Sequence, residues 1–186
     1  HEIRPSDAEA SFPTLRASIG YAPSLDPARL RRMMHGTGSA QTLTMDLSFN
    51  EPLLTLEWLD LGEHGTRFPA YSLNEFVAEK FRAILQQPGR KRNRPQDAFD
   101  IDVLLGTHPA LQDAESRAEI LRILRAKSIE REVPVTRAGL RDPAVRDRSA
   151  RDYAALRAQL LVKPPPFEAM FARVTAYYES LPWPAD

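Results

Sequence analysis

Hydrophobic and polar residues alternate along residues 41–49. Every second position is apolar, and Asp46 lies on the other side of this pattern. A period of two is typical of a half-buried strand, so we expect a strand in which Asp46 points away from the core. Two further strand-like runs follow at residues 53–61 and 66–71. Together they predict a small antiparallel β group.

The pattern becomes helical after Ser72. A short basic helix is also expected upstream of the strands, from Pro27 to Gly36. Residues 1–23 contain proline and glycine but no sustained period, which predicts an irregular arm. Arginine and aspartate alternate between residues 141 and 152, as is typical of a solvated loop with self-neutralising charge. The helices expected after Ser72 cover residues 73–86, 95–105, 113–128, 150–161 and 167–181.

This order of elements predicts an α+β fold, with a β-containing domain at residues 1–71 and a helical region at residues 72–186. No apolar run approaches the roughly 20 residues of a membrane span, so we expect no membrane partner. The chain has no cysteine, which excludes disulfides and thiolate metal sites, and its start lacks a signal-peptide pattern. We expect a cytoplasmic protein. Its 25 basic and 25 acidic residues balance, so affinity for nucleic acid would need a local patch.

Lys80 falls on the apolar arc of the helix expected at residues 73–86. A lysine is rarely buried without a partner, so its ammonium group either reaches solvent along the surface or serves a cleft. The same helix opens with Ser72 and Glu75, which fit the S-x-x-E capping box. Glu75 therefore has a structural explanation as a reciprocal cap.

Asp97 and Asp100 share one face of the next expected helix with apolar residues. Asp97 gains from the helix dipole whatever its function, whereas Asp100 lies one turn deeper. The basic loop 90–94 between the two helices would suit phosphate groups. Lys80 and the two aspartates are then either a charged cluster at a phosphate-handling cleft or a buried ion pair that joins two helices.

Two segments resemble a known family. Residues 71–83 read YSLNEFVAEKFRA and residues 92–101 read RNRPQDAFDI. They are similar to the third and fourth motifs of the AbiEii/AbiGii-type nucleotidyltransferase toxins, L-x-E-x-x-A-x-K and R-x-x-x-R-D-x-x-D or close variants. The resemblance covers about residues 40–186, including a final helix that closes in Leu-Pro-Trp.

The resemblance implies the C-terminal part of a polymerase-β-like nucleotidyltransferase fold. It implies the toxin of a bacterial type IV toxin–antitoxin or abortive-infection pair, with an antitoxin as a possible partner. Such enzymes transfer a nucleotide from an NTP with Mg²⁺, and related toxins add it to the 3′ end of tRNA. Matched position by position, the catalytic residues are Lys80, Asp97, Asp100 and Asp46, with Asp46 also a metal ligand. The resemblance and the basic loop assign phosphate binding to Arg94, Arg92 and Lys91.

The family's first motif, which supplies the principal pair of metal-binding aspartates, is not found upstream of Asp46. The segment from Gly36 to Ser39 resembles it in part, but Ser48 stands where a second aspartate is expected, so we interpret it as a turn before a strand. The resemblance then implies a chain that begins within the catalytic fold, as a fragment, through a misplaced start or in a decayed gene. A second hypothesis stays open: a catalytically incomplete module that binds RNA or an antitoxin through Arg29–Arg32 and Arg90–Arg94.

Overall fold

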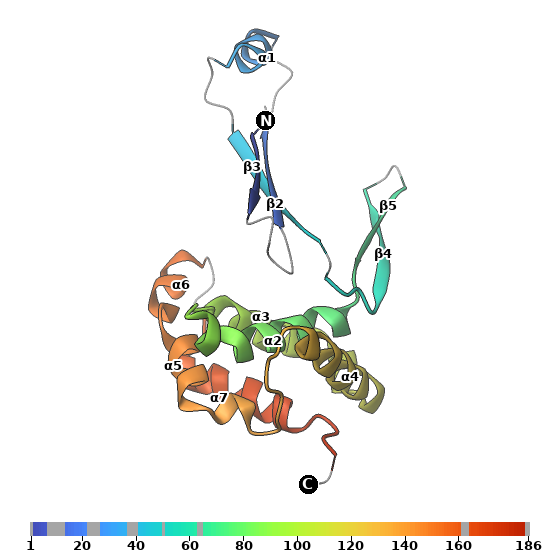
Figure 1. Cartoon of the computed structure of the whole chain (residues 1–186), viewed down its shortest axis with the longest axis vertical. Coiled ribbons are helices and arrows are strands. Elements are labelled where there is room, and N and C mark those ends of the chain that lie inside the picture. The colour runs from blue at the N-terminus through green and yellow to red at the C-terminus, as the bar shows by residue number, and fades with distance from the viewer. Residues whose placement is uncertain are drawn as a thin grey trace. The chain divides into compact units, whose positions relative to one another are not determined.

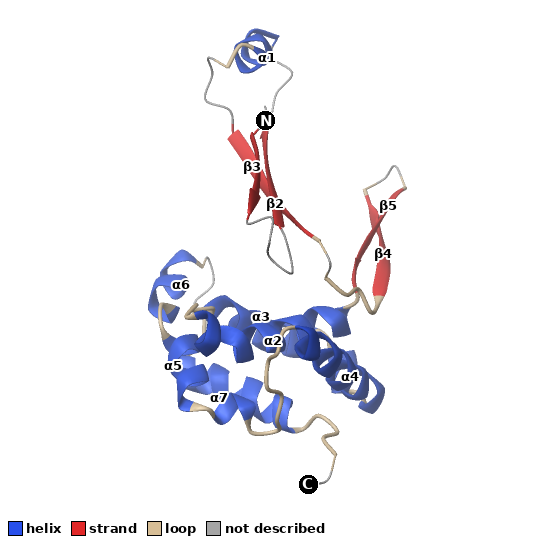
Figure 2. Ribbon diagram, in the orientation of Figure 1, coloured by secondary structure: helices blue, strands red, loops and turns tan. Residues whose placement is uncertain are grey.

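The computed structural model describes residues 2–6, 14–21, 27–36, 41–49, 51–62, 65–160 and 164–184. The chain forms two compact units, His1–Pro52 and Leu53–Asp186, and most helices and strands of each are labelled in Figure 1. Figure 2 shows that the described strands all precede α2, after which the chain contains helices and loops. The expected α+β fold is confirmed. The domain division expected after residue 71 stays a prediction.

The first unit contains a three-stranded antiparallel sheet in the order β1-β2-β3. Its elements are β1 (Glu2–Ser6), β2 (Thr14–Tyr21), α1 (Pro27–Met34) and β3 (Gln41–Ser48). The register sets Leu15 opposite Leu47 and Arg16 opposite Asp46. Directly opposed residues share a face of the sheet, so Asp46 lies on the face opposite the apolar residues of β3, as expected.

The irregular arm expected at residues 1–23 is wrong where the structure describes it, because this segment supplies β1 and β2. Pro5 lies in β1, which is an edge strand of the sheet. Proline is tolerated on an edge because its missing N–H does not break an interior ladder. Residues 15–19 also alternate between apolar and polar, and the flanking prolines and glycine hid this pattern. The turn expected at residues 37–39 lies outside the described residues.

The second unit begins with a hairpin of β4 (Leu56–Leu61) and β5 (Thr66–Tyr71). The two strands pair antiparallel, with Leu56 opposite Tyr71. The strand expected to begin at residue 53 begins at 56. In the described sheets β3 pairs with β2 and β4 pairs with β5, so the single β group expected from the sequence is two separate sheets.

Helices form the rest of the second unit. Within the described residues, none is both long and apolar enough to span a membrane. The α-helices are α2 (Leu73–Arg90), α3 (Pro95–Thr107), α4 (Ala114–Glu130), α5 (Pro143–Ala150), α6 (Tyr153–Gln159) and α7 (Phe167–Glu179), and the short 3-10 turns are η1 (Pro109–Gln112) and η2 (Gly139–Arg141).

The start and end of α2 are both set by local chemistry. The hydroxyl of Ser72 accepts a hydrogen bond of 3.2 Å from the backbone N–H of Glu75, which satisfies one of the free donors at the helix start. The helix ends at Lys91, whose φ of 52° is left-handed and whose N–H returns to the last turn. The capping box also predicts a hydrogen bond from the Ser72 N–H to the Glu75 side chain. This prediction is wrong, because the Ser72 N–H donates to the carbonyl of Thr55.

The apolar core of the second unit joins α2, α3, α4 and α7. Phe81 of α2 is fully buried and packs against Tyr177 and Tyr178 of α7. Truncation of such a side chain to alanine typically costs about 3–5 kcal/mol, so this contact fixes α2 against α7. The other fully buried apolar residues include Val77, Ile84, Ala98, Ile101, Ile120, Ile123, Leu124, Met170 and Val174.

The solvated loop expected between residues 141 and 152 is wrong, because its centre forms α5. Pro143 stands at the start of this helix, and the Asp142 side chain accepts a hydrogen bond of 2.8 Å from the N–H of Ala144. Val145 and Ser149, one turn apart, face inward and are buried. Only one narrow face of α5 is apolar, so its charged residues dominated the sequence pattern. The helix expected at 150–161 is the shorter α6.

Candidate functional site

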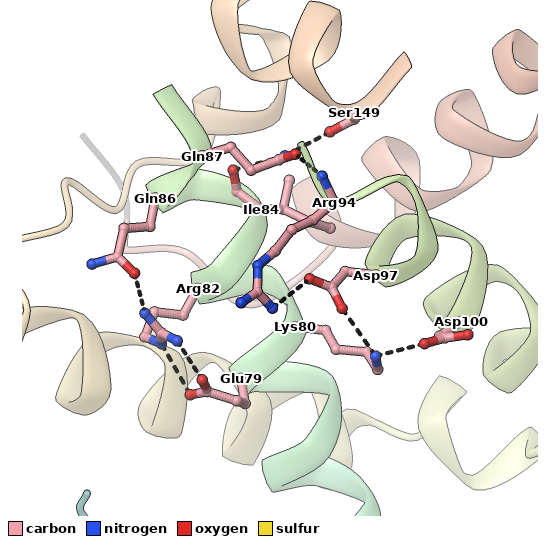
Figure 3. Close-up of polar contacts among 10 residues, drawn as sticks. All are labelled: Glu79, Lys80, Arg82, Ile84, Gln86, Gln87, Arg94, Asp97, Asp100 and Ser149. Carbon is pink, nitrogen blue, oxygen red and sulfur yellow. Dashed lines mark hydrogen bonds and ion pairs between the residues drawn. The ribbon is translucent and has the colours of Figure 1, made fainter. Parts of the chain in front are cut away.

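The two aspartates of α3 converge on the ammonium group of Lys80. Its Nζ atom lies 3.1 Å from Oδ1 of Asp97 and 2.6 Å from Oδ2 of Asp100, as Figure 3 shows. The Lys80 side chain is 12% exposed. The expectation that Lys80 lies on the buried face of α2 is therefore confirmed, and its ammonium group is paired.

The position of Lys80 follows from the packing of α2. Val77 and Phe81 on the same helix are fully buried, and α2 packs against α3. The ammonium group also lies 4.6 Å from the centre of the Phe76 ring, which adds a cation–π contact. Rigid neighbours thus hold Lys80, so little side-chain entropy is left to lose when a ligand binds.

Asp97 is the most buried carboxylate of this cluster. Its side chain is 7% exposed, and its second oxygen lies 3.3 Å from Nη1 of Arg94. Asp97 also stands in the first turn of α3, where the helix dipole favours negative charge. It therefore joins Lys80 on α2 to Arg94 in the basic loop.

The cluster is electrically balanced, and Asp100 is its most exposed carboxylate. Two cations, Lys80 and Arg94, face two carboxylates, and Asp100 is 41% exposed. Solvent reaches Asp100, so the Asp100 side is where a ligand would approach Lys80. A phosphate group that arrives there would meet an ammonium group already desolvated on its other side, and electrostatic attraction is strongest in such a setting.

A buried glutamine holds the basic loop to α2. The side-chain oxygen of Gln87 accepts a hydrogen bond of 2.7 Å from the backbone N–H of Arg94. Its side-chain nitrogen donates to the carbonyl of Ile84 and, at 2.8 Å, to the hydroxyl of Ser149 on α5 (Figure 3). Gln87 is 1% exposed, and every polar atom of its side chain is satisfied. The loop is therefore fixed where Arg94 turns toward Asp97.

Lys91 and Arg92, the other expected phosphate-binding residues, lie exposed on this loop. Arg92 N–H donates to the carbonyl of Gln87, so its backbone is also tied to α2. Their side chains form no ion pair within the described part of the chain. Both cations are accessible to a ligand, although the structure leaves their role a prediction.

A second buried lysine, Lys127 of α4, was not found from the sequence. Its Nζ lies 2.7 Å from Oε1 of Glu75 and 4.6 Å from the centre of the Tyr71 ring. The Glu75 carboxylate also accepts hydrogen bonds from the N–H groups of Leu54 and Thr55. Glu75 thus fastens the segment before β4 to α2 and α4 instead of capping its own helix. The signal was present in α4, where Lys127 continues an apolar face of Ile120, Ile123 and Leu124.

Asp46 belongs to the first unit, where it pairs with a neighbouring strand. Its carboxylate accepts hydrogen bonds of 2.7 and 2.9 Å from Nε and Nη2 of Arg16. These hydrogen bonds hold the pKa of Asp46 below its ordinary value. The pair is exposed, so its net effect on stability is small.

The described residues do not form a complete magnesium site. Mg²⁺ requires near-octahedral oxygen coordination, and no group of three or more Asp, Glu, His or Cys side chains converges within the part of the chain that the structure describes. Asp46 pairs with Arg16, while Asp97 and Asp100 pair with cations. These three carboxylates therefore do not complete a magnesium site within the described residues.

Comparison with protein families identifies the chain. Residues 3–173 match the family described as nucleotidyl transferase AbiEii toxin, type IV TA system. No curated protein and no solved structure gives a significant match. The match spans most of the 186 residues, so the chain belongs to the AbiEii family of nucleotidyltransferase toxins. The enzyme class and the toxin–antitoxin context expected from the two sequence motifs are confirmed.

Proposed function

We propose that this protein transfers a nucleotide from an NTP to RNA, and that its acceptor is the 3′ end of tRNA. The product would block translation, so the protein would act as an abortive-infection toxin in the bacterial cytoplasm, countered by an antitoxin. The observation that carries this proposal is the largely buried ammonium group of Lys80, held by Asp97 and by the partly exposed Asp100.

Lys80 is the residue we propose to contact the triphosphate. In the transfer, the 3′ oxygen of the RNA bonds to the α-phosphorus, the bond to pyrophosphate breaks, and the hydroxyl proton is released. Charge then builds on the leaving pyrophosphate, and a fixed ammonium group stabilises it without further reorganisation. Asp97 and Asp100 orient Lys80. Arg94 binds a phosphate oxygen of the NTP, and Arg92 and Lys91 bind phosphate oxygens where the NTP meets the RNA.

Mg²⁺ is the divalent ion that we propose for the reaction, with Asp46 as one ligand. Because the described residues do not complete its coordination, the other ligands are unassigned. Removal of divalent ions with EDTA should abolish transfer, and Mg²⁺ should restore it. Transfer that persists in EDTA would contradict both the requirement for Mg²⁺ and the role of Asp46 as its ligand.

A second candidate function rests on the same carboxylates. Asp46, Asp97 and Asp100 are each paired with a cation, which is also the arrangement of a purely structural set of ion pairs. In that case the protein would be a catalytically incomplete module that binds RNA or an antitoxin. Arg31 and Arg32 are exposed on α1 and would belong to that surface, whereas the side chain of Arg29 lies outside the described residues.

Transfer of label from each of the four NTPs to bulk tRNA tests the proposal. We compare the native chain with Lys80→Met and with Arg173→Gln. The control breaks an ion pair to Asp102, also on α3 but away from Lys80. Loss of one such electrostatic contact costs about 10²–10³ in rate, so Lys80→Met should lose that factor and Arg173→Gln should retain activity.

The outcomes separate the two candidate functions. Equal transfer by Lys80→Met and Arg173→Gln would show that Lys80 does not take part in the reaction. No transfer by the native chain, together with salt-dependent binding of tRNA that survives Lys80→Met, would favour the binding module. Thermal unfolding of each variant shows whether a loss of transfer reflects a loss of fold.

A further inference from the structure

The basic loop 90–94 lies against the end of α5, two segments that are far apart in the sequence. Asn93 connects them through both ends of its amide group. Its nitrogen donates a hydrogen bond of 3.0 Å to Asp152, and its oxygen accepts one of 3.3 Å from Arg148. Packing of α5 against α2 supports the same juxtaposition. The loop and the residues that follow α5 therefore form one continuous surface.

This surface carries an excess of positive charge. Arg90, Lys91, Arg92 and Arg151 are exposed, and none of them forms an ion pair within the described residues. Arg148 donates to a neutral amide. The nearby Asp152 carboxylate accepts from Asn93, and Asp147 on α5 pairs with Arg146. We call these five residues the basic patch: Arg90, Lys91, Arg92, Arg148 and Arg151.

Elsewhere the arginines of this unit are mostly neutralised. Arg122 pairs with Glu119, Arg141 with Glu179, and Arg173 with Asp102. Because the whole chain has 25 basic and 25 acidic residues, its overall charge does not attract polyanions. The basic patch is a local departure from this balance, as expected of a surface that binds phosphates.

The backbone of the basic patch is held in place. Gln87 fixes the N–H of Arg94, Lys91 caps α2 in a left-handed conformation, and Asn93 bridges the loop to Arg148 and Asp152. A surface that is ordered before binding loses less entropy when a ligand arrives. The loop also leads to the Lys80 cluster through the ion pair of Arg94 and Asp97.

We infer that the basic patch binds the phosphate backbone of the RNA acceptor and directs its 3′ end to the Lys80 cluster. This inference rests on the proposed function and adds Arg148 and Arg151, which the sequence assigned to a solvated loop. Successive phosphates of an RNA strand can each meet a cation when two segments contribute cations to one surface. An acidic protein surface is the alternative partner, and competition by polyglutamate distinguishes it from RNA.

The test is the binding of bulk tRNA to the full chain over a range of salt concentrations. We compare Arg90→Gln/Arg151→Gln with Arg122→Gln/Arg141→Gln, which removes the same net charge from paired arginines. Each lost phosphate contact lowers the slope of log K against log salt by about 0.7–0.9. The patch variant should therefore bind about tenfold more weakly, with a slope lower by about one to two, and the control should bind like the native chain.

Three results would overturn the inference. The first is an equal effect of the two double variants. The second is competition by polyglutamate as strong as that by tRNA, which would indicate an acidic protein partner. The third is a native chain that does not bind tRNA, which would also remove the proposed RNA acceptor. Because Arg90 and Arg151 lie outside the proposed NTP contacts, unchanged NTP binding by the patch variant would locate the defect in RNA binding.

Discussion

The backbone N–H of Arg94 donates a hydrogen bond of 2.7 Å to the side chain of Gln87. This contact sets the position of Arg94, and through Arg94 the position of the Asp97 carboxylate. A residue that does not face the ligand thus controls two residues that we place at the site.

Gln87→Met should weaken NTP binding. Methionine has nearly the same length but accepts no hydrogen bond from Arg94, so the loop loses its fixed position. Removal of a buried hydrogen-bonding partner costs about 1–3 kcal/mol, and we expect a similar loss of stability with an affinity for NTP lower by about fivefold. Calorimetric titration with NTP measures the affinity.

Gln86→Met is the matched control for this prediction. Gln86 is the next residue on α2, but its side chain accepts from Arg82 and not from the loop. It should bind NTP like the native chain. In an Arg94→Ala background, Gln87→Met should have a much smaller effect on affinity, because the main residue that it positions is already absent. A full additional loss there would show that Gln87 does not act through Arg94.

Glu75→Gln should destabilise the protein most at neutral pH. Burial acts to raise the pKa of Glu75, but hydrogen bonds from Lys127, Thr55 and Leu54 outweigh it and leave the pKa below the ordinary 4.5. The ionised carboxylate therefore contributes its full stability at pH values above the unfolded-state pKa of Glu75. This contribution is lost as the pH falls through the lower pKa of the folded state. Breaking one partner of a buried pair typically costs about 3–5 kcal/mol.

Denaturant unfolding between neutral and acidic pH measures this effect. The difference between native and Glu75→Gln chains should shrink below about pH 4.5. Glu119→Gln, which breaks the partly exposed pair with Arg122, should cost less than about 1 kcal/mol. A difference for Glu75→Gln that stays constant with pH would contradict the role of its charge.

Gly139→Ala should destabilise the helical unit by about 1–3 kcal/mol. A Cβ atom at this position would lie 2.8 Å from Cδ2 of Leu85 and 3.3 Å from the hydroxyl of Tyr178. That hydroxyl donates to the carbonyl of Thr136, so Tyr178 cannot move without losing a hydrogen bond. Gly106→Ala is the control, since a Cβ there meets nothing within 4 Å. Equal melting temperatures for the two variants would refute the close packing.

The sequence predicted the elements whose pattern is local. The helical spacing of Lys80 and of Asp97 with Asp100 indicated which faces these residues occupy, and the structure brings all three together. Each of these faces is defined within a single helix, so the periodicity of α2 and α3 was sufficient.

Features that depend on distant partners were not predictable in this way. Glu75 fits a capping box locally, but its carboxylate instead binds Lys127 and the backbone amides before β4. The apolar face of α5 consists of little more than Val145. Ser149 is also buried, and its hydroxyl accepts a hydrogen bond from Gln87 on the distant helix α2. β1 contains Pro5, which argues against a strand unless the strand is known to lie at an edge.

Asp97→Asn and Asp100→Asn should separate stability from catalysis. Asp97 is 7% exposed and pairs with both Lys80 and Arg94, so its neutralisation leaves Arg94 without a carboxylate and Lys80 with Asp100 alone, and should cost about 3 kcal/mol. Asp100 is 41% exposed, and water screens the loss of its charge, so the cost should stay below about 1 kcal/mol. Both variants weaken the contacts that position Lys80, and both should lower nucleotide transfer.

Asp100→Asn should therefore give a folded protein of nearly native melting temperature with reduced transfer, as measured by thermal unfolding and label incorporation into tRNA. Native transfer rates in Asp100→Asn would show that Asp97 alone is enough to orient Lys80.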